Sequence, residues 1–357
     1  MYIAMILVGG IPAIATSIYL RFFILRVLSS FINITTVIKI VVTIAAVLLA
    51  LPAVNFLGLY AVLYYYFLAA CAVFGLISHF VPAGIFRGLL QSGLLSVVAV
   101  SLIMGYGYYN MHHVVETDYT IKSNKINNLK ILLISDLHTD QVFNPRQING
   151  LVQKMNKVNP DLVVLDGDIF DENTPKKDML AATKALSQLH NKLGIYYVYG
   201  NHDDSKYGNW HTSNRSHSNA SDIRTAMENN HITVLDDDVK NIGKITLIGR
   251  RDASYDRKLT DDLLKDVNKD QYIIMLDHQP LEIQKNAKKG VDLQLSGHTH
   301  GGQIWPTGYL NDFMPGSMRY GNKTIGSFHA ITTSGLAGWG FPIKTGSPSE
   351  YVVINVK

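Results

Sequence analysis

The sequence predicts an α-helical membrane domain followed by an α/β domain, and three observations support this fold class. The first 115 of the 357 residues contain no acidic residue and four basic ones, whereas 28 acidic residues accompany 28 basic ones in the remainder. Four apolar runs of membrane-spanning length lie in the first part, and strand-length apolar runs alternate with helix-length segments in the second. We therefore predict a four-helix transmembrane domain over residues 1–110, a juxtamembrane linker over 111–128 and a globular domain over 129–357.

Each N-terminal apolar run is long enough to cross a bilayer, which takes about 20 residues of helix. The runs cover residues 2–20, 40–60, 61–80 and 89–109. The second and third are separated by a turn around Gly58, so we expect them to form a helical hairpin. A cleaved signal peptide is disfavoured because the N-terminus lacks a basic segment and three further runs follow. The sequence therefore predicts a multi-pass protein of the cell membrane.

The basic residues of this part predict the side of the membrane on which the C-terminal domain lies. Arg21, Arg26 and Lys39 fall between the first two spans, and Arg87 falls between the last two. Loops that carry Lys and Arg remain in the cytoplasm, so the chain after the fourth span is predicted to be extracytoplasmic. Three lysines between residues 122 and 130 argue for the opposite orientation, but they lie farther from the last span.

Charge and cysteine content exclude several classes of protein. The formal net charge of +4 resides in the apolar N-terminal part, so it does not indicate a surface that binds nucleic acid. The one cysteine, Cys71, falls inside the third span, so the sequence contains neither a disulfide framework nor a thiolate metal site. The partner that this composition predicts is the lipid bilayer, and nothing in the sequence indicates an oligomeric state.

Beyond the linker, strands and helices alternate, which predicts parallel strands joined by right-handed crossovers. The first strands are expected at 131–135, 162–165 and 195–199, with helices at 146–156 and 177–193. Further strands are expected at 232–235, 245–248, 272–276, 291–295, 329–333 and 351–356, which would suffice for a second sheet. Residues 204–221 are rich in Ser, Asn and His and predict a mobile loop. Loops rich in Gly and aromatic residues at 301–324 and 335–346 indicate either contact with a ligand or lipid, or ordinary packing.

Five short motifs of Asp, His, Asn and Gly each follow a predicted strand of this domain. They are Asp136-Leu137-His138, Gly167-Asp168-Ile169-Phe170-Asp171, Gly200-Asn201-His202-Asp203, Asp277-His278 and Gly297-His298-Thr299-His300-Gly301-Gly302. One such motif alone is weak, because short patterns of this kind arise by chance. Open α/β sheets bind ligands at the carboxyl ends of their strands, so five in succession predict one shared metal site of oxygen and nitrogen donors.

In this order, the five motifs resemble the signature of the calcineurin-like metallophosphoesterase superfamily and cover essentially the whole C-terminal domain. The stretch from Gly297 to Gln303 is similar to the bacterial branch of membrane-anchored or exported phosphodiesterases of the YkuE and YaeI type. The resemblance implies a two-sheet β-sandwich flanked by helices, with two divalent metal ions at its site. Mn²⁺ is the cation that the resemblance favours, and Fe or Zn²⁺ also suit such donors.

The resemblance also implies a role for each motif residue. One ion is expected to bind Asp136, His138, Asp168 and His300, and the other Asp168, Asn201, His278 and His298. Asp168 would then bridge the ions, and a hydroxide that they share would attack phosphorus. His202 is expected to act on the substrate phosphate or the leaving group, with Asp203 fixing its orientation. Asp171 is expected behind the ligands, and a turn or helix-cap role stays open for Asp171 and Asp203.

These features predict a membrane-anchored phosphoester hydrolase that cleaves a phosphodiester or a pyrophosphate. A lipid-linked phosphate ester is the favoured substrate, because a site tethered near the bilayer meets such molecules at high effective concentration. The main alternative is a phosphodiesterase that acts on soluble nucleotides. A transporter with an appended domain is disfavoured because the predicted spans lack interior charges. A catalytically silent receptor is disfavoured because it has no chemical need for a complete ligand set.

Overall fold

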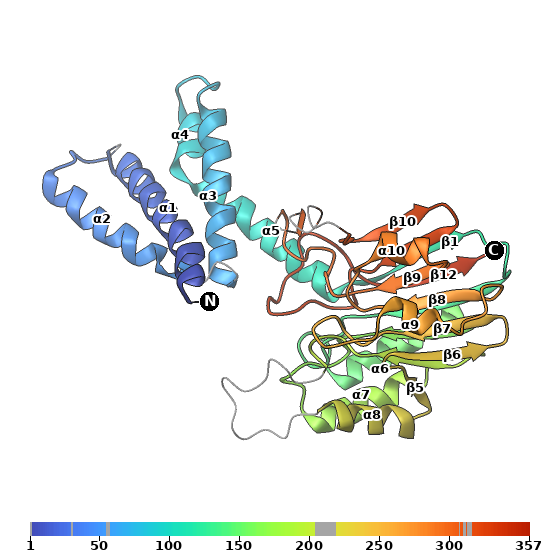
Figure 1. The fold of residues 1–357 in the computed structure, drawn as a ribbon. Helices are drawn as coiled ribbons and strands as arrows, with labels where there is room; N and C mark the ends of the chain where they lie inside the picture. Colours follow the sequence, from blue (N-terminus) through green and yellow to red (C-terminus); the bar gives the residue numbers. More distant parts are fainter. Residues whose placement is uncertain are drawn as a thin grey trace. The chain divides into compact units, whose positions relative to one another are not determined.

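The chain divides into two compact units, Met1–Tyr106 and Gly107–Lys357 (Figure 1). The computed structural model describes residues 2–29, 31–54, 58–203, 219–306, 308–309, 312 and 316–357. The loop predicted for residues 204–221 therefore lies outside the described residues up to position 218, and its last residues begin a helix.

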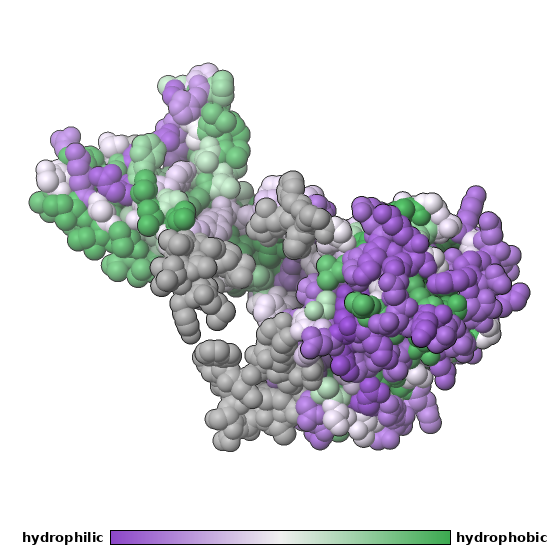
Figure 2. All heavy atoms as spheres, viewed as in Figure 1, coloured by the Kyte–Doolittle hydropathy of each residue, from purple (hydrophilic) through white to green (hydrophobic). Residues whose placement is uncertain are grey.

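The N-terminal unit is built from apolar helices. They are α1 (Tyr2–Ser29), α2 (Thr36–Ala50), the 3₁₀ turn η1 (Leu51–Val54), α3 (Leu59–Ser78), α4 (Ile85–Ser92) and α5 (Leu94–His112), of which α5 continues into the second unit. Four segments are long and apolar enough to cross a membrane, namely Gly10–Ser29, Thr36–Val54, Leu59–Ser78 and Leu94–His112. Apolar side chains also cover much of the surface of this unit, as Figure 2 shows. The four predicted spans thus correspond to four helical segments.

The helix boundaries differ from the predicted ones where caps and glycines set them. The first helix continues to Ser29, nine residues beyond the predicted end at Leu20. The side chain of Thr35 begins α2 by accepting a hydrogen bond from the backbone N–H of Ile38. Gly93 adopts a left-handed φ of 80° between α4 and α5, so the run predicted at 89–109 is divided between two helices.

The C-terminal unit contains two six-stranded sheets. The first has the order β1-β12-β2-β3-β4-β5, formed by β1 (Val114–Ile121), β12 (Ser349–Val356), β2 (Leu129–Ile134), β3 (Leu162–Asp166), β4 (Ile195–Val198) and β5 (Ile232–Val234). The second has the order β10-β11-β9-β8-β7-β6, formed by β10 (Gly321–Ile325), β11 (Phe328–Thr332), β9 (Leu293–Ser296), β8 (Tyr272–Leu276), β7 (Ile245–Gly249) and β6 (Asp238–Ile242). The pairs β12–β2, β10–β11 and β6–β7 are antiparallel, and the others are parallel. The predicted α/β domain with two sheets is confirmed.

Alternate residues of the central strands face different cores. In β2, Ile131 and Leu133 belong to the core that joins the two sheets. Leu132 and Ile134 instead belong to the core shared with α6 (Pro145–Met155), its 3₁₀ extension η2 (Asn156–Val158), α7 (Lys176–Leu186) and α8 (Ala220–Asn229). The outer face of the second sheet packs with α9 (Thr260–Leu264) and α10 (Ile283–Lys288). Each fully buried aliphatic side chain contributes about 1.5–3 kcal/mol, so a shift of β2 by one residue would be strongly unfavourable.

Part of the predicted linker at 111–128 is a strand of the first sheet. β1 pairs in parallel with β12 along its full length, from Val114 beside Ser349 to Ile121 beside Val356. Its side chains alternate between more and less exposed positions, as expected of a strand at the edge of a sheet. The folded domain therefore begins before residue 129.

The last turn of α5 belongs to the C-terminal unit and is hydrogen-bonded to other parts of it. The side-chain amide of Asn110 donates hydrogen bonds to the carbonyl oxygens of Lys344 and Ser347, at 2.8 and 2.6 Å. The backbone N–H of Lys344 donates to the carbonyl of Gly107 at 2.9 Å. The hydroxyl of Ser349 donates to the carbonyl of Met111 at 3.0 Å. Hydrogen bonds thus join this turn to the loop that precedes β12 and to the first residue of that strand.

The five motifs follow the carboxyl ends of parallel strands from both sheets. Asp136 comes after β2, Asp168 after β3 and Asn201 after β4 in the first sheet. His278 comes after β8 and His298 after β9 in the second. Since neighbouring parallel strands end at the same edge of a sheet, these residues gather at one end of the sandwich.

Candidate metal centre

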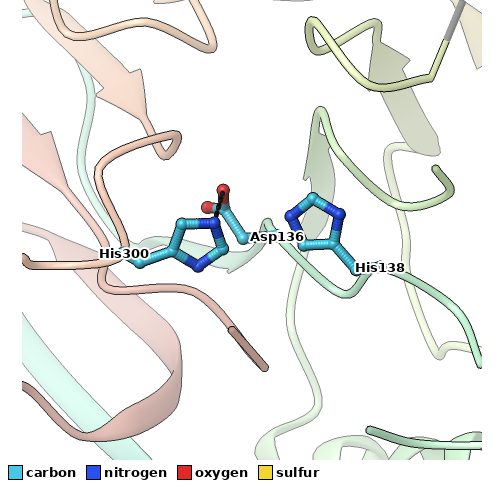
Figure 3. A group of neighbouring side chains, drawn as sticks. All are labelled: Asp136, His138 and His300. Carbon is cyan, nitrogen blue, oxygen red and sulfur yellow. Dashed lines mark ion pairs between the residues drawn. The ribbon is translucent and has the colours of Figure 1, made fainter. Parts of the chain in front are cut away.

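Six of the predicted ligands form two groups at these strand ends. One group is Asp136, His138 and His300, and the other is Asp168, His278 and His298. Within each group the ligand atoms lie within 4.8 Å of one another. Figure 3 shows the carboxylate of Asp136 directed towards the ring of His300, with the ring of His138 on the other side of Asp136. Each group falls within one of the two ligand sets that the resemblance implies, with Asp168 absent from the first group and Asn201 from the second.

Five of these ligands have a left-handed backbone conformation. The φ angles are 52° for Asp136, 42° for His138, 51° for Asp168, 69° for His298 and 49° for His300. Residues other than glycine adopt this conformation at a cost of about 1 kcal/mol or more, and such strain concentrates at functional sites. The sharp turns also break the alternation of an extended chain. His298 and His300 therefore join different groups although they are two residues apart.

The carboxylate of Asp168 lies between the two groups. Its Oδ2 is 3.1 Å from Nε2 of His278 in its own group and 3.9 Å from Nε2 of His138 in the other. Its Oδ1 accepts a hydrogen bond from the backbone N–H of His202 at 2.9 Å. A side chain at Gly200 would collide with this carboxylate, so the third motif requires glycine there. Oδ2 of Asp168 therefore faces ligands of both groups, so this carboxylate could serve a cation in either group.

Several buried polar atoms of the site have no hydrogen-bond partner. Among the predicted ligands they are both ring nitrogens of His138, Nε2 of His278 and the side-chain oxygen Oδ1 of Asn201. An unsatisfied buried polar group costs about 1–3 kcal/mol, so native proteins seldom retain them without a reason. A cation held beside these atoms would satisfy them. Asn201 is thereby consistent with the ligand role predicted for it next to Asp168.

Burial keeps two of the imidazoles neutral. It lowers the pKa of His138 to about 3, and it lowers the pKa of His300 to about 4 with help from the ammonium of Lys344. A neutral imidazole is the form that binds a metal ion. His278 differs, because the adjacent carboxylate of Asp168 overcomes its burial and raises its pKa well above the usual value. A divalent cation at Asp168 would compete with that proton.

The donor set is suited to divalent transition metals. It consists of carboxylate oxygens, imidazole nitrogens and one amide oxygen, without sulfur. Such donors suit Mn²⁺, Fe or Zn²⁺ and are unsuited to metals that prefer thiolate. The residues present therefore fit the pair of divalent cations that the resemblance implies.

The ring of His202 lies beside the ligands. Its centroid is 5.4 Å from that of His138, and its Nδ1 is 2.7 Å from the carboxylate oxygen Oε1 of Glu172. Burial alone would lower the pKa of His202, but the hydrogen bond to Glu172 and the charge of Asp168 raise it above the usual value. The ring of Trp339 packs against the imidazole with 4.8 Å between centroids. His202 is thus oriented and favoured in its protonated form.

The contacts of Asp203 correspond to the turn role that stayed open for it, and not to an orienting contact with the ring of His202. Its carboxylate accepts hydrogen bonds from the backbone N–H groups of Asp168, Phe170 and Gly200, at 2.7 to 2.8 Å. Burial and the charge of Asp168 raise its pKa to about 7. Asp203 therefore braces the turns that carry the second and third motifs, and the carboxylate on Nδ1 of His202 is that of Glu172.

Sequence reasoning did not identify Glu172, and it placed Trp339 only within the aromatic loop at 335–346, for which contact with a ligand or lipid and ordinary packing both stayed open. Glu172 follows Asp171 directly, and Asp171 itself lies 4.0 Å from Nδ1 of His138 behind the ligands. An acidic residue at the end of the second motif was a signal that could have pointed to a partner for His202. Trp339 is far away in the sequence, and its contact depends on the path of a long loop.

The comparisons with known proteins agree with this geometry. The calcineurin-like phosphoesterase family matches residues 129–302. An uncharacterized metallophosphoesterase of Campylobacter jejuni is 30% identical over 276 residues, covering 74% of this chain and 69% of that protein. YkuE of Bacillus subtilis, also an uncharacterized metallophosphoesterase, is 30% identical over 275 residues, covering 74% of this chain and 94% of YkuE.

A third relative extends the similarity beyond the C-terminal unit. The transmembrane protein with metallophosphoesterase domain of Danio rerio is 26% identical over 337 residues, covering 87% of this chain and 74% of that protein. This is more of the chain than the unit Gly107–Lys357 contains, so the match includes part of the apolar helices. The chain therefore belongs to the calcineurin-like metallophosphoesterase family.

Proposed function

We propose that the protein is a membrane-anchored phosphoester hydrolase that depends on two divalent metal ions and cleaves a phosphodiester or pyrophosphate bond in a lipid-linked substrate. The observation that carries this proposal is the position of Asp168 between two buried ligand groups, with the imidazole of His202 beside them. Phosphoryl transfer is catalysed mainly by positioning and by neutralisation of charge. A centre that can hold two cations around one carboxylate can both position the phosphate and neutralise its charge.

The ligands divide into three sets according to the cation that they would hold. Asp136, His138 and His300 would hold one cation, Asn201, His278 and His298 the other, and Asp168 both. Bound divalent cations would neutralise charge on the phosphate and supply an ionised water at neutral pH. We propose Mn²⁺ as the resident cation, and Fe and Zn²⁺ fit the same donors.

His202 would donate a proton to the oxygen of the leaving group. Glu172 fixes the ring through Nδ1, and against the effect of burial this hydrogen bond raises the pKa of His202, which favours the imidazolium. A protonated imidazole beside the scissile bond can give its proton to the departing oxygen. Asp168 also accepts a hydrogen bond from the backbone N–H of His202, which couples the position of this residue to the metal ligands.

The apolar helices would anchor the centre at a bilayer as a multi-pass membrane domain. In the structure, Arg21 and Arg26 lie in the C-terminal half of α1, Lys39 lies in the first turn of α2, and Arg87 lies in α4 between the third and fourth candidate spans. Basic residues near these two connections support an extracytoplasmic C-terminal unit, by the rule that Lys and Arg are retained on the cytoplasmic side. A tethered centre meets phosphate esters borne by lipids at high effective concentration. This is the support for a lipid-linked substrate over a soluble nucleotide.

The test is a substrate panel with the full-length, Mn²⁺-loaded protein. The panel holds a phosphomonoester, a phosphodiester, a nucleoside diphosphate and a lipid pyrophosphate, with Asp168→Asn as the inactive variant and the exposed Asp270→Asn as its matched control. We expect the highest kcat/KM on a lipid-linked diester or pyrophosphate, and loss of turnover with a chelator. A preference for soluble nucleotides would contradict the lipid assignment. Absence of all hydrolysis with two ions bound would contradict the enzyme assignment.

A further inference from the structure

We propose that Trp339 forms one wall of a subsite that binds the organic leaving group of the substrate, and that this group begins with an apolar or aromatic moiety. The inference rests on the proposed function and narrows it to esters of such alcohols. It follows from the contact between Trp339 and His202, from the exposure of the indole ring and from the way its loop is held.

The indole of Trp339 lies against the residue that would protonate the leaving group. Its ring centroid is 4.8 Å from that of His202, and the two rings are inclined by 31°. At the same time, 44% of Trp339 is exposed to solvent. An imidazole that delivers a proton to the departing oxygen lies next to that oxygen. The organic group attached to the oxygen would therefore lie beside the indole.

The loop around Trp339 is held by a buried amide. The side-chain nitrogen Nε2 of Gln303 donates hydrogen bonds to the carbonyls of Trp339, Phe341 and Ile343, and its Oε1 accepts one from the backbone N–H of Trp339. A Cβ at Gly338 would lie 2.5 Å from the side chain of Met111. The backbone that directly precedes Trp339 is therefore also closely packed. The indole is presented by a constrained backbone.

A buried lysine fixes the start of the same loop to the metal ligands. The ammonium of Lys344 donates hydrogen bonds to the carbonyls of Ser334, Gly335 and Ala337. The carbonyl of Ala337 in turn lies 3.4 Å from Nδ1 of His300. The loop therefore places Trp339 in a defined position relative to the centre, as a binding surface requires.

The chemistry of the indole selects the ligand class. An uncharged aromatic face gains free energy from contact with apolar or aromatic groups and offers little to a free phosphate. Metal ligands and His202 recognise the phosphoryl group whatever its substituent. Trp339 would thus increase the affinity for phosphate esters whose organic group is apolar or aromatic.

The experiment measures binding and does not need turnover. Calorimetric titrations of the full-length, Mn²⁺-loaded protein compare phenylphosphonate with methylphosphonate, which share a headgroup and differ in the organic group. We expect the wild type to prefer phenylphosphonate. Trp339→Ala should weaken its binding about tenfold, the equivalent of ~1.4 kcal/mol, while changing methylphosphonate less than about twofold. Trp339→Phe should restore most of the preference, and Trp305→Ala, which removes another exposed indole, should leave it intact.

Three outcomes would overturn the inference. They are a wild type without preference for the phenyl group, an equal loss for both phosphonates in Trp339→Ala, and an equal loss of preference in Trp305→Ala. Metal content measured on each variant shows whether the centre itself is preserved. If the wild type hydrolyses no ester but shows the Trp339-dependent preference, the proposed function fails and the subsite stands. If it hydrolyses esters without that preference, the subsite fails and the proposed function stands.

Discussion

Replacement of Glu172 by glutamine isolates the electrostatic support of His202. The carboxylate of Glu172 is 2.7 Å from Nδ1 of His202 and is 7% exposed, so solvent screens the interaction little. A hydrogen bond to a charged group contributes about 1.5–3 kcal/mol, and ~1.36 kcal/mol corresponds to one pKa unit. Glutamine preserves the shape and removes the charge. Glu172→Gln should therefore lower the pKa of His202 by about one unit.

The sign of the effect follows from the role of the imidazole. The active form is protonated, so turnover declines as pH rises through the pKa of His202. In Glu172→Gln this decline should begin about one pH unit lower, and kcat well below the pKa should be little changed. The assay is a pH profile of kcat for a diester with an alkyl leaving group, which needs a proton. A 4-nitrophenyl ester serves as the comparison because its leaving group needs little protonation.

The matched control is Glu228→Gln, which removes an exposed carboxylate paired with Arg224. Its pH profile should match that of the wild type. An unshifted alkaline limb in Glu172→Gln would refute the assignment of Glu172 as the partner that supports the imidazolium. Loss of bound metal in this variant would instead place Glu172 among the residues that hold the centre together.

Three other predictions concern the centre and its side of the membrane. Asp168→Asn should abolish turnover and reduce bound metal measured by elemental analysis, because this carboxylate faces both ligand groups; two ions at full occupancy with near-normal activity would contradict a shared centre. His202→Ala should lower kcat by about 10² to 10⁴ while both metals stay bound, as expected of a proton donor; metal loss like that of a ligand variant would refute this role. A reporter fused after Lys357 should be active when it requires export and silent when it requires the cytoplasm, and the reverse result would show that the lysines at 122–130 set the orientation.

The central strands and the ligand groups could be predicted because their signals are local. In β2 and β3, continuous apolar runs indicate strands that are buried on both faces. The motif residues follow directly at the ends of these strands. Strand β1 was not predicted because an edge strand exposes alternate residues, which are often polar. Its sequence, Val-Val-Glu-Thr-Asp-Tyr-Thr-Ile, is polar enough to resemble a linker. Helix α7 ends at Leu186, earlier than the predicted Leu193, because the chain must turn back to enter β4.

The contacts around His202 could not be predicted because they join distant parts of the chain. The third motif places Asp203 next to His202, and the resemblance implied that Asp203 fixes the orientation of the imidazole. In the structure, the turns bring three backbone N–H groups to Asp203, and these donors compete successfully for its carboxylate. Glu172, which is hydrogen-bonded to His202, lies 30 positions before it in the sequence. Such pairings depend on the tertiary fold and leave no periodic signal in the sequence.

The attachment of the last turn of α5 determines where the protein can be divided for work in solution. A fragment that begins at residue 129, where the family match begins, would lose β1 and expose the backbone of β12 as an unpaired edge. Exposed edges of this kind invite pairing with other molecules and aggregation. It would also lose Asn110, which holds the loop that carries Lys344. A soluble fragment with an intact centre should therefore start no later than Gly107 and include the last turn of α5.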